Sequence, residues 1–334
     1  MAIEDVAEPG SARAGNVIVR PEAVGICGSD FHLFSGELGA ISGARDFYPR
    51  IQGHEVSALV EDPGSADVGH AVKRGDRVAI LPLLPCGRCY PCRIGRPNVC
   101  PSFRLVGVHT DGGLQQRLEI PAGNVFGVGD LEPDATAFVE PASIMVHALA
   151  RGRLRPDEQV VVFGAGPIGL AAVLAATHAG ARVLAVDPME NRRDLAKRLG
   201  AEHAAWAPET LKDQIAEWTD GDGPPLIVET SGEVAVLPQA IEMVSPAGRI
   251  VVAGMSEATA PVRPGAFPEK EIDVIGTSCA TADDFRTAID LVKASTISAE
   301  IFSHHFPLAR AAEAFDFAMH RPPDAIKVIV TIEQ

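Results

Sequence analysis

Four cysteines lie close together in the segment PCGRCYPCRIGRPNVC, residues 85–100. Thiols at this density can form disulfides, act as a redox pair, or bind a metal ion as thiolates. The C-x2-C-x2-C spacing lets neighbouring thiolates reach one ion, and a fourth sulfur completes a tetrahedron with no open coordination position. This pattern is typical of a structural zinc site, whose ligands would be Cys86, Cys89, Cys92 and Cys100.

The rest of the chain argues against the other two interpretations. At 334 residues, with a polar start that does not resemble a signal peptide, the chain is expected to be a two-domain cytoplasmic protein with reduced thiols. Disulfide frameworks belong instead to short secreted chains. A redox pair would need one C-x-x-C at the start of a helix, whereas this loop repeats the spacing and is interrupted by Pro and Gly residues.

Composition and charge narrow the class of partner. The net charge of −15 is spread along the chain without a basic block, which argues against nucleic acid or an anionic membrane surface as a partner. No segment offers the roughly 18 consecutive apolar residues that a membrane helix needs. We therefore expect a partner that is a small molecule.

A second chemical signal is the glycine-rich segment VVVFGAGPIGLAAVLA, residues 160–175. It contains G-x-G-x-x-G directly after a strand pattern and at the start of a helix pattern, and Asp187 ends the next strand 21 residues after Gly166. In this context the motif predicts a dinucleotide site, in which the helix N-terminus binds the pyrophosphate. The bland alternative is a glycine turn that only packs a βαβ unit. The predicted contacts in this turn are Gly164, Gly166, Pro167, Ile168 and Gly169.

Further residues would define the cofactor. The carboxylate of Asp187 would accept hydrogen bonds from the adenosine ribose and repel a 2′-phosphate, which favours NAD over NADP. Arg192 and Arg193 lie just beyond and would soften that preference. Thr230 and Gly254 follow strand patterns whose carboxyl ends meet the same edge, so we expect them to contact the cofactor, mostly through backbone.

The elements that must position these groups change in character along the chain. Residues 15–125 carry short β-rich runs separated by turn residues, which predicts a small β domain with long loops. From about residue 145 strand and helix patterns alternate, as in a parallel sheet covered by helices on both faces. The last part of the chain returns to helix and ends in the strand pattern IKVIVTI, residues 326–332.

Three further segments complete a family pattern when they are read with the two signals above. They are C-G-S-D-x-H at residues 27–32, G-H-E at residues 53–55 and E-P at residues 140–141. In this order, and over nearly the whole chain, the segments resemble the zinc-dependent medium-chain alcohol and polyol dehydrogenases, in particular the sorbitol and threonine branch. The resemblance implies an α/β protein with a GroES-like, β-rich catalytic domain (residues 1–142 and 278–334, with both zinc sites) and a Rossmann doubly wound domain (residues 143–277).

The resemblance also implies a second, catalytic zinc and therefore two zinc ions per chain. Cys27 and His54 match family ligands, and Glu55 matches the carboxylate that binds zinc directly in polyol dehydrogenases or swings in during turnover. Glu140 stands where ordinary alcohol dehydrogenases have a second cysteine, and would bind zinc directly or through water. Asp30 would orient the ring of His54.

The implied reaction transfers hydride from a secondary alcohol to NAD⁺. Ser29 would accept the alcohol proton and His32 would pass it outward. Lys327 matches a basic family position that contacts the pyrophosphate, and the alternative is a solvated lysine. The resemblance further implies a homodimer or homotetramer that pairs through the edge of the nucleotide domain's sheet, and a substrate cleft between the domains.

Several alternatives stay open at this level. The substrate is a polyol, a sugar acid or a hydroxy amino acid, or else a simple primary alcohol or aldehyde. A non-catalytic dinucleotide sensor is a further alternative from another class. The family's first β-hairpin is expected to be missing or shortened, and the loop around Arg45, Asp46 and Tyr48 either shapes the substrate pocket or is ordinary surface.

Overall fold

The computed structural model describes residues 1–35, 48–64, 72–295, 297, 299–320 and 322–333. The chain divides into two compact units. The first contains residues Met1–Glu140, Ala280–Lys293 and Phe302–Gln334, and the second contains Pro141–Cys279 and Ala294–Ile301. The boundaries expected from the sequence lie within two residues of the crossings at 140–141 and 279–280. Residues 294–301, expected in the first unit, group with the second, where Glu300 pairs with Arg198.

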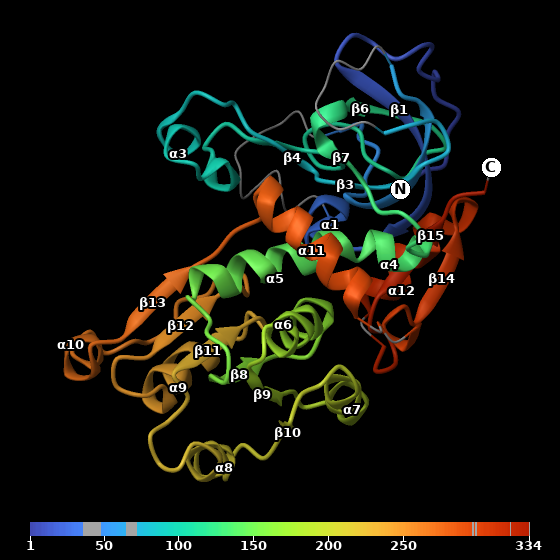
Figure 1. Ribbon diagram of the computed structural model, residues 1–334. Coiled ribbons are helices and arrows are strands. Elements are labelled where there is room, and N and C mark those ends of the chain that lie inside the picture. The colour runs from blue at the N-terminus through green and yellow to red at the C-terminus, as the bar shows by residue number, and fades with distance from the viewer. Residues whose placement is uncertain (36–47, 65–71, 296, 298, 321, 334) are drawn as a thin grey trace. The chain divides into compact units, whose positions relative to one another are not determined.

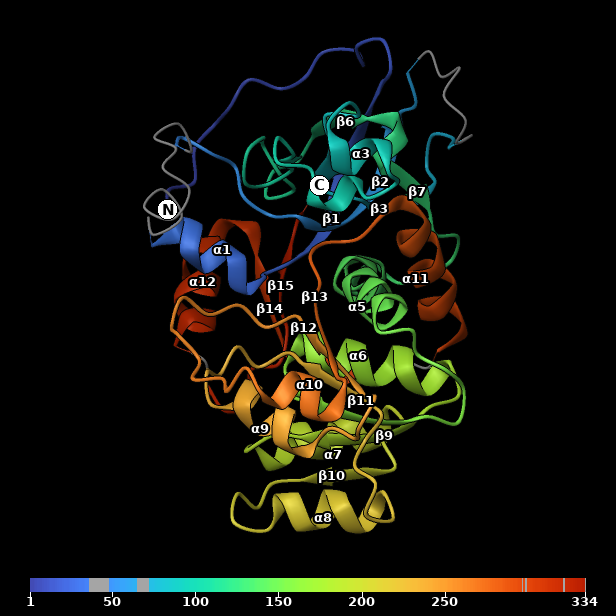
Figure 2. The same ribbon diagram turned by 90° about the vertical axis from the view of Figure 1, so that its left-hand side faces the viewer.

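The first unit is built on a largely antiparallel sheet with the strand order β14-β15-β1-β2-β3-β7, in which β6 also pairs with β1 (Figure 2). The long strand β1 is its centre, because β2, β6 and β15 all pair with it. The strands of this unit are β1 (Asn16–Gly25), β2 (Glu55–Asp62), β3 (Arg77–Ile80), β4 (Leu83–Leu84), β5 (Arg104–Leu105), β6 (Leu118–Pro121), β7 (Val125–Gly127), β14 (His304–Pro307) and β15 (Val328–Thr331).

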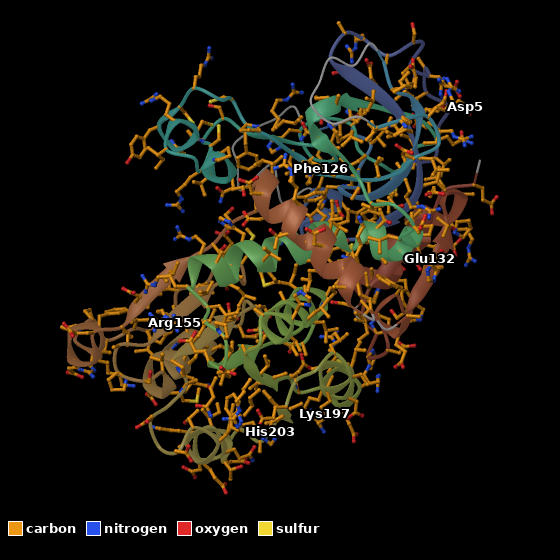
Figure 3. The ribbon with its side chains drawn as sticks, viewed as in Figure 1. Asp5, Phe126, Glu132, Arg155, Lys197 and His203 are labelled. Atoms are coloured by element: carbon orange, nitrogen blue, oxygen red, sulfur yellow. The ribbon has the colours of Figure 1, made fainter. Side chains whose placement is uncertain are left out.

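Alternating valines on these strands form the core of the first unit. Val17 and Val19 of β1 and Val56 of β2 point inward, and Phe315 of α12 packs against them. Burying each such side chain contributes about 1.5–3 kcal/mol. Phe126 of β7, labelled in Figure 3, lies 5.1 Å from Phe285 of α11 between ring centroids. The helices that belong wholly or largely to this unit are α1 (Gly28–Phe34), α3 (Tyr90–Arg93), α4 (Pro133–Ala137), α11 (Ala282–Ala294) and α12 (Ala311–Met319).

The second unit contains a six-stranded sheet whose strands are all parallel, in the order β10-β9-β8-β11-β12-β13 (Figure 1). This is the doubly wound order, which reverses direction beside the first strand of the unit, β8. Its strands are β8 (Gln159–Phe163), β9 (Arg182–Val186), β10 (His203–Ala205), β11 (Leu226–Glu229), β12 (Arg249–Val252) and β13 (Asp273–Gly276).

Helices bury both faces of the central strands. Val161 of β8 and Ile227 of β11 pack with Ile215 of α8 and Ile241 of α9 on one face, while Val160 and its neighbours of the same parity are equally buried on the other. Such two-sided burial explains why these strands are continuous apolar runs. The helices are α6 (Pro167–His178), α7 (Glu190–Arg198), α8 (Leu211–Trp218), α9 (Val236–Met243) and α10 (Ala266–Lys270), and α5 (Val139–Arg151) crosses from the first unit.

The predicted fold class is confirmed: a GroES-like β-rich unit accompanies a Rossmann doubly wound unit. Within the described residues, no helix combines the length and the apolar composition that crossing a bilayer requires.

Candidate metal and cofactor sites

The four-cysteine loop brings its sulfur atoms together in the first unit. Cys86, Cys89, Cys92 and Cys100 each offer a sulfur, and these four atoms all lie within 4.8 Å of one another. The Sγ atoms of Cys89 and Cys92 are 3.4 Å apart, and α3 begins directly after Cys89. Four thiolates at about 2.3 Å from one zinc ion would be separated by distances of this size, so the donor set fits the predicted structural ion.

None of the six cysteines, all of which lie in the described part of the chain, is disulfide-bonded. Backbone N–H groups of Arg88 and Cys89, together with the Cys100 thiol, lower the pKa of Cys86 to about 6. A thiol with so low a pKa is a thiolate at neutral pH, and thiolates are the form that binds metal ions. For Cys89 the backbone N–H of Cys92 lowers the pKa, but burial and the neighbouring thiols of Cys92, Cys86 and Cys100 outweigh it and raise the pKa to about 12. Thiolates this close together repel one another unless a cation lies between them, which is consistent with a set of metal ligands.

A second donor cluster forms where two segments of the first unit meet. The end of β1 pairs with the start of β2, so that Gly25 lies opposite Glu55. Cys27 follows β1 and His54 precedes β2, which places both side chains at this junction. Donor atoms of Cys27, His54 and Glu55 lie within 4.8 Å of one another. A thiolate, an imidazole and a carboxylate are a donor set that suits zinc.

His54 is held from both sides of its ring. Its Nδ1 atom lies 3.2 Å from Oδ1 of Asp30, and its Nε2 atom lies 3.4 Å from Oγ of Ser29. Burial disfavours the charged ring, but Asp30 and Cys27 outweigh it and raise the pKa of His54 well above its ordinary value. Asp30 also accepts a hydrogen bond from the Cys27 N–H at 2.9 Å. The carboxylate thus fixes the orientation of His54 and leaves Nε2 directed toward the other donors.

Glu55 has a partner that the sequence did not predict. Nζ of Lys327 lies 2.5 Å from its carboxylate and also donates to the Ile26 carbonyl at 3.0 Å. Both side chains of the pair are buried, at 3% and 1% exposure. A side chain on Gly25 would collide with this pair, because its Cβ would lie 2.0 Å from Oε2 of Glu55.

This pair excludes one of the two readings of Lys327. The lysine is not solvated, because β15 pairs with β1 and thereby delivers Lys327 to the carboxylate of Glu55, and its contact with a pyrophosphate stays a prediction. Burial lowers the pKa of its ammonium group. The negative charges of Glu55 and Cys27 raise the pKa by more than burial lowers it, so the pKa lies above its ordinary value. A lysine within the apolar strand IKVIV was the available signal, since buried lysines are almost always paired.

Glu140 is close to the cluster but is not one of the three donors grouped above. It lies in the first turn of α5 and is 8% exposed. Burial, the largest cause, and the charge of Glu55 raise its pKa while His54 and Lys327 lower it, and the net result is a pKa of about 7. A carboxyl group with this pKa exchanges a proton readily near neutral pH.

The residues of the predicted proton relay share one helix. Ser29 is half-buried in α1 and touches His54, whereas His32 is exposed one turn later on the same helix. Residues three apart lie on the same side of a helix. Arg45 and Asp46, the loop residues considered for the substrate pocket, lie outside the described residues, and Tyr48 is exposed.

In the second unit the glycine-rich turn has the geometry that its sequence predicted. Gly164 has φ +92°, a value that favours glycine, and Gly166 precedes α6, whose first residue is Pro167. A Cβ on Gly169 would lie 1.8 Å from the Gly164 carbonyl, so only glycine lets helix and turn approach so closely. Ile168 lies in the first turn of α6, whose free N–H groups favour an anion.

Asp187 is placed at this turn but is more engaged than expected. It is 3% exposed, and its carboxylate accepts hydrogen bonds from the N–H groups of Ala165 at 2.8 Å and Met189 at 2.9 Å. It therefore holds the glycine turn in place, and its role toward a ribose stays a prediction. Arg192 extends toward the turn, with Nη1 4.0 Å from where a Cβ of Gly166 would lie, whereas Arg193 donates to the Asp187 carbonyl at 2.8 Å.

The ends of β11 and β12 complete this edge of the sheet. The hydroxyl of Thr230 donates to the carbonyls of Phe163 at 2.8 Å and Gly164 at 3.2 Å, so it ties β11 to the glycine turn. Gly254 follows β12 and donates its N–H to the Glu229 carbonyl at 3.0 Å. The structure thus gathers Gly164, Thr230 and Gly254 at the carboxyl edge, as the sequence predicted for a parallel sheet.

Comparison with known proteins gives the same division of the chain. Residues 13–130 match the family model of the alcohol dehydrogenase GroES-like domain, and residues 167–294 match that of the zinc-binding dehydrogenases. Together these matches cover more than half of the chain.

Individual relatives match over almost the full length. The chain is 30% identical to L-galactonate-5-dehydrogenase of Escherichia coli K12 over 94% of this chain and 91% of the relative. It is 31% identical to sorbitol dehydrogenase of Bacillus subtilis over 94% of this chain and 89% of the relative. The solved structure of RspB from E. coli CFT073, complexed with NADH, superposes with a TM-score of 0.86 at 31% identity, covering 97% of this chain and 93% of that one. The chain belongs to the zinc-type medium-chain alcohol and polyol dehydrogenase family and is an oxidoreductase of that family.

Proposed function

We propose that this oxidoreductase transfers hydride from a secondary alcohol of a polyol, a sugar acid or a hydroxy amino acid to NAD⁺. The observation that carries the proposal is the convergence within 4.8 Å of donor atoms from two segments, one with Cys27 and the other with His54 and Glu55. A merely structural role would not require donors of three chemical kinds beside a half-buried serine.

Cys27, His54 and Glu55 would hold the catalytic zinc ion, and Glu140 would approach it directly or through water. When bound, such an ion acts as a Lewis acid that lowers the pKa of an alcohol and orients it, while NAD⁺ accepts the hydride. Asp30 keeps the ring of His54 in the orientation that directs Nε2 toward the other donors. Lys327 would compete with the zinc ion for the carboxylate of Glu55, because its ammonium group already pairs with that carboxylate.

The same residues define a path for the proton of the alcohol. The hydroxyl oxygen of Ser29 lies 3.4 Å from Nε2 of His54. It would accept the alcohol proton and pass it along α1 to His32, whose exposed ring returns it to solvent. General-base assistance of this kind contributes roughly 10²–10⁴-fold in rate.

The substrate class follows from the acidic donors and from the relatives. Two carboxylates, Glu55 and Glu140, lie at a site where ordinary alcohol dehydrogenases use a second cysteine. The relatives named for L-galactonate and sorbitol act on polyhydroxylated compounds, which supports a polar substrate here.

The glycine turn would bind the pyrophosphate of the cofactor. Asp187 lies at the end of β9, where a carboxylate disfavours the 2′-phosphate of NADP, and Arg192 lies beside the turn. The RspB structure contains NADH and a similar structure from Sinorhizobium meliloti contains NADP, so the expected preference rests on Asp187. We therefore expect NAD⁺ to be used in preference to NADP⁺.

One plate assay tests the proposal. Protein purified without chelator is offered C4–C6 polyols, aldonates, threonine and simple primary alcohols with NAD⁺ or NADP⁺, and reduced cofactor is measured by absorbance. We expect reduction of NAD⁺ with at least one polyhydroxylated or hydroxy-acid substrate, and about two zinc ions per chain by elemental analysis. Tight NADH binding without turnover of any substrate would favour the dinucleotide sensor instead.

We further propose that the protein is a homo-oligomer that pairs through β13. This strand ends the six-stranded sheet, and Val274 at its centre is 39% exposed. An uncovered edge strand presents backbone groups that can pair with a second copy. Light scattering should give a mass of two or four chains, and Val274→Pro should halve it, because the contact between β13 strands joins the chains in pairs.

A further inference from the structure

Glu229 is a buried carboxylate at the carboxyl edge of the second unit's sheet. It ends β11 and is 3% exposed. Its Oε1 atom accepts three hydrogen bonds, from the N–H of Ser231 at 2.7 Å, the hydroxyl of Ser231 at 2.6 Å and the N–H of Gly232 at 2.9 Å. The carboxylate therefore folds the turn that follows β11 back onto the end of its own strand.

The same residue also organises the neighbouring strand end. The Glu229 carbonyl accepts hydrogen bonds from the N–H groups of Ala253 at 2.8 Å and Gly254 at 3.0 Å. A Cβ on Gly254 would lie 2.4 Å from Oε2 of Glu229 and 2.3 Å from the nitrogen of Gly232. The turns after β11 and β12 are thus packed backbone to backbone around one side chain.

This pair of turns is joined to the glycine-rich turn. Thr230, the residue after Glu229, donates its hydroxyl to the carbonyls of Phe163 and Gly164 and its N–H to Phe163. A Cβ on Gly164 would lie 2.8 Å from the Thr230 hydroxyl oxygen. Three neighbouring strand ends are therefore fixed together, and Glu229 supplies the charge-assisted bonds at their centre.

A negative charge at this edge would oppose the phosphates of a dinucleotide if it faced them. Its burial and its three donors direct Oε1 into the protein instead. We propose that Glu229 is a positioning residue for cofactor binding: it fixes the turns after β11 and β12 against the glycine-rich turn before the cofactor arrives. This inference rests on the proposed use of a dinucleotide, and it deepens that function by naming the group that preorganises the binding edge.

Two substitutions distinguish the contribution of the Glu229 acceptor oxygen from that of its negative charge. Glu229→Gln keeps an oxygen that can accept the same three bonds, whereas Glu229→Ala removes the acceptor. We expect the Kd for NADH, measured by fluorescence titration, to rise about tenfold or more in the alanine variant and to stay within about threefold in the glutamine variant. The KM for the alcohol at saturating NAD⁺ should change less than about twofold, because only the cofactor edge is affected.

Hydrogen exchange provides a second measurement that needs neither cofactor nor turnover. Without NADH, the amides of Ser231 and Gly232 should exchange faster in Glu229→Ala than in the unaltered protein, and at nearly unaltered rates in Glu229→Gln. A matched control is Glu158→Ala, which removes another largely buried carboxylate of the same unit, paired with Arg249 at the start of β12. It should reduce stability without changing the Kd for NADH.

The outcomes are distinct. If folded Glu229→Ala binds NADH as the unaltered protein does, or if Glu158→Ala weakens binding equally, the positioning role is wrong while the proposed function stands. If the unaltered protein binds no dinucleotide, both fail, and the first titration shows this before any variant is made.

Discussion

The two donor clusters of the first unit are built in opposite ways. The four-cysteine loop takes all its donors from residues 86–100, and three of its four cysteines are partly exposed. The cluster of Cys27, His54 and Glu55 takes its donors from two segments, and a third segment contributes Lys327. His54 and Glu55 are buried, whereas the cysteine loop has little core around it.

This difference between the two clusters suits the cysteine loop to stabilising the fold and the second cluster to catalysis. The loop offers four donors of one kind, which leaves no position for a substrate. The second cluster offers three donors of different kinds, and each is held by a neighbour: Cys27 and His54 by Asp30, and Glu55 by Lys327. A site that must bind an ion and also exchange protons needs such support, whereas a site that only pins a loop does not.

The largest expected effect is on turnover, at the second cluster. Cys27→Ala removes a donor, and since a Lewis-acid ion is worth several kcal/mol to the reaction, NADH formation should fall at least about 10³-fold. Elemental analysis should show the loss of one zinc ion per chain. Cys279→Ala is the matched control, because Cys279 belongs to neither cluster. Unaltered activity in Cys27→Ala would remove the functional distinction between the clusters.

The next effect concerns stability, at the four-cysteine loop. Cys92→Ser should also remove one zinc ion, but the result should be a fall of roughly 10 °C or more in Tm, because metal binding there contributes folding free energy. Turnover per folded molecule, measured well below Tm, should remain. A variant that keeps its Tm but loses turnover would contradict the assignment of the loop to stability.

A third test addresses the buried ion pair. Lys327→Met leaves the carboxylate of Glu55 buried without its cation, which should lower the free energy of unfolding of the metal-free protein by about 3–5 kcal/mol. Zinc should reduce the loss, because Glu55 can then bind the ion. Urea unfolding with and without zinc measures both values, and Lys327→Arg, which keeps the charge, is the control. Equal losses in both conditions would show that Glu55 does not approach the ion.

The smallest expected effect is a pH dependence. Burial and, to a smaller extent, the charge of Glu55 raise the pKa of Glu140, which is about 7 instead of an ordinary 4.5, so the folded protein keeps a proton that the unfolded chain has lost. The stability that this proton contributes is complete below pH 4.5 and is lost as the pH rises to about 7. In metal-free protein, Glu140→Gln should show a weaker decline over this range. Parallel stability curves for the two proteins would contradict the raised pKa.

Local sequence was a good guide wherever the geometry is local. The four-cysteine loop and the glycine turn each lie within about sixteen residues, so spacing alone predicted which atoms would meet. The doubly wound sheet followed from the alternation of strand and helix patterns, because parallel strands need crossover helices.

Long-range contacts were harder to anticipate. Lys327 and Glu55 are 272 positions apart, and only the pairing of β15 with β1 brings them together. Glu229 was not singled out, because its approach to the turn after β12, where its Oε2 atom would lie 2.4 Å from a Cβ on Gly254, depends on the pairing of two strands. Asp187 was expected to face a ribose, yet its carboxylate also holds the glycine turn. In each case the partner is a backbone group or a side chain that no spacing rule specifies.

The amino-acid sequence by itself determined which donors and which turns this protein possesses, because the four cysteines, the G-H-E segment and the glycine-rich motif are each short contiguous segments. Only the tertiary structure decided how the scattered groups are paired, because the register of β1 with β2 and β15 sets which buried charges neutralise one another. Buried charges must find partners, and strand pairing across the whole chain determines which partners are within reach.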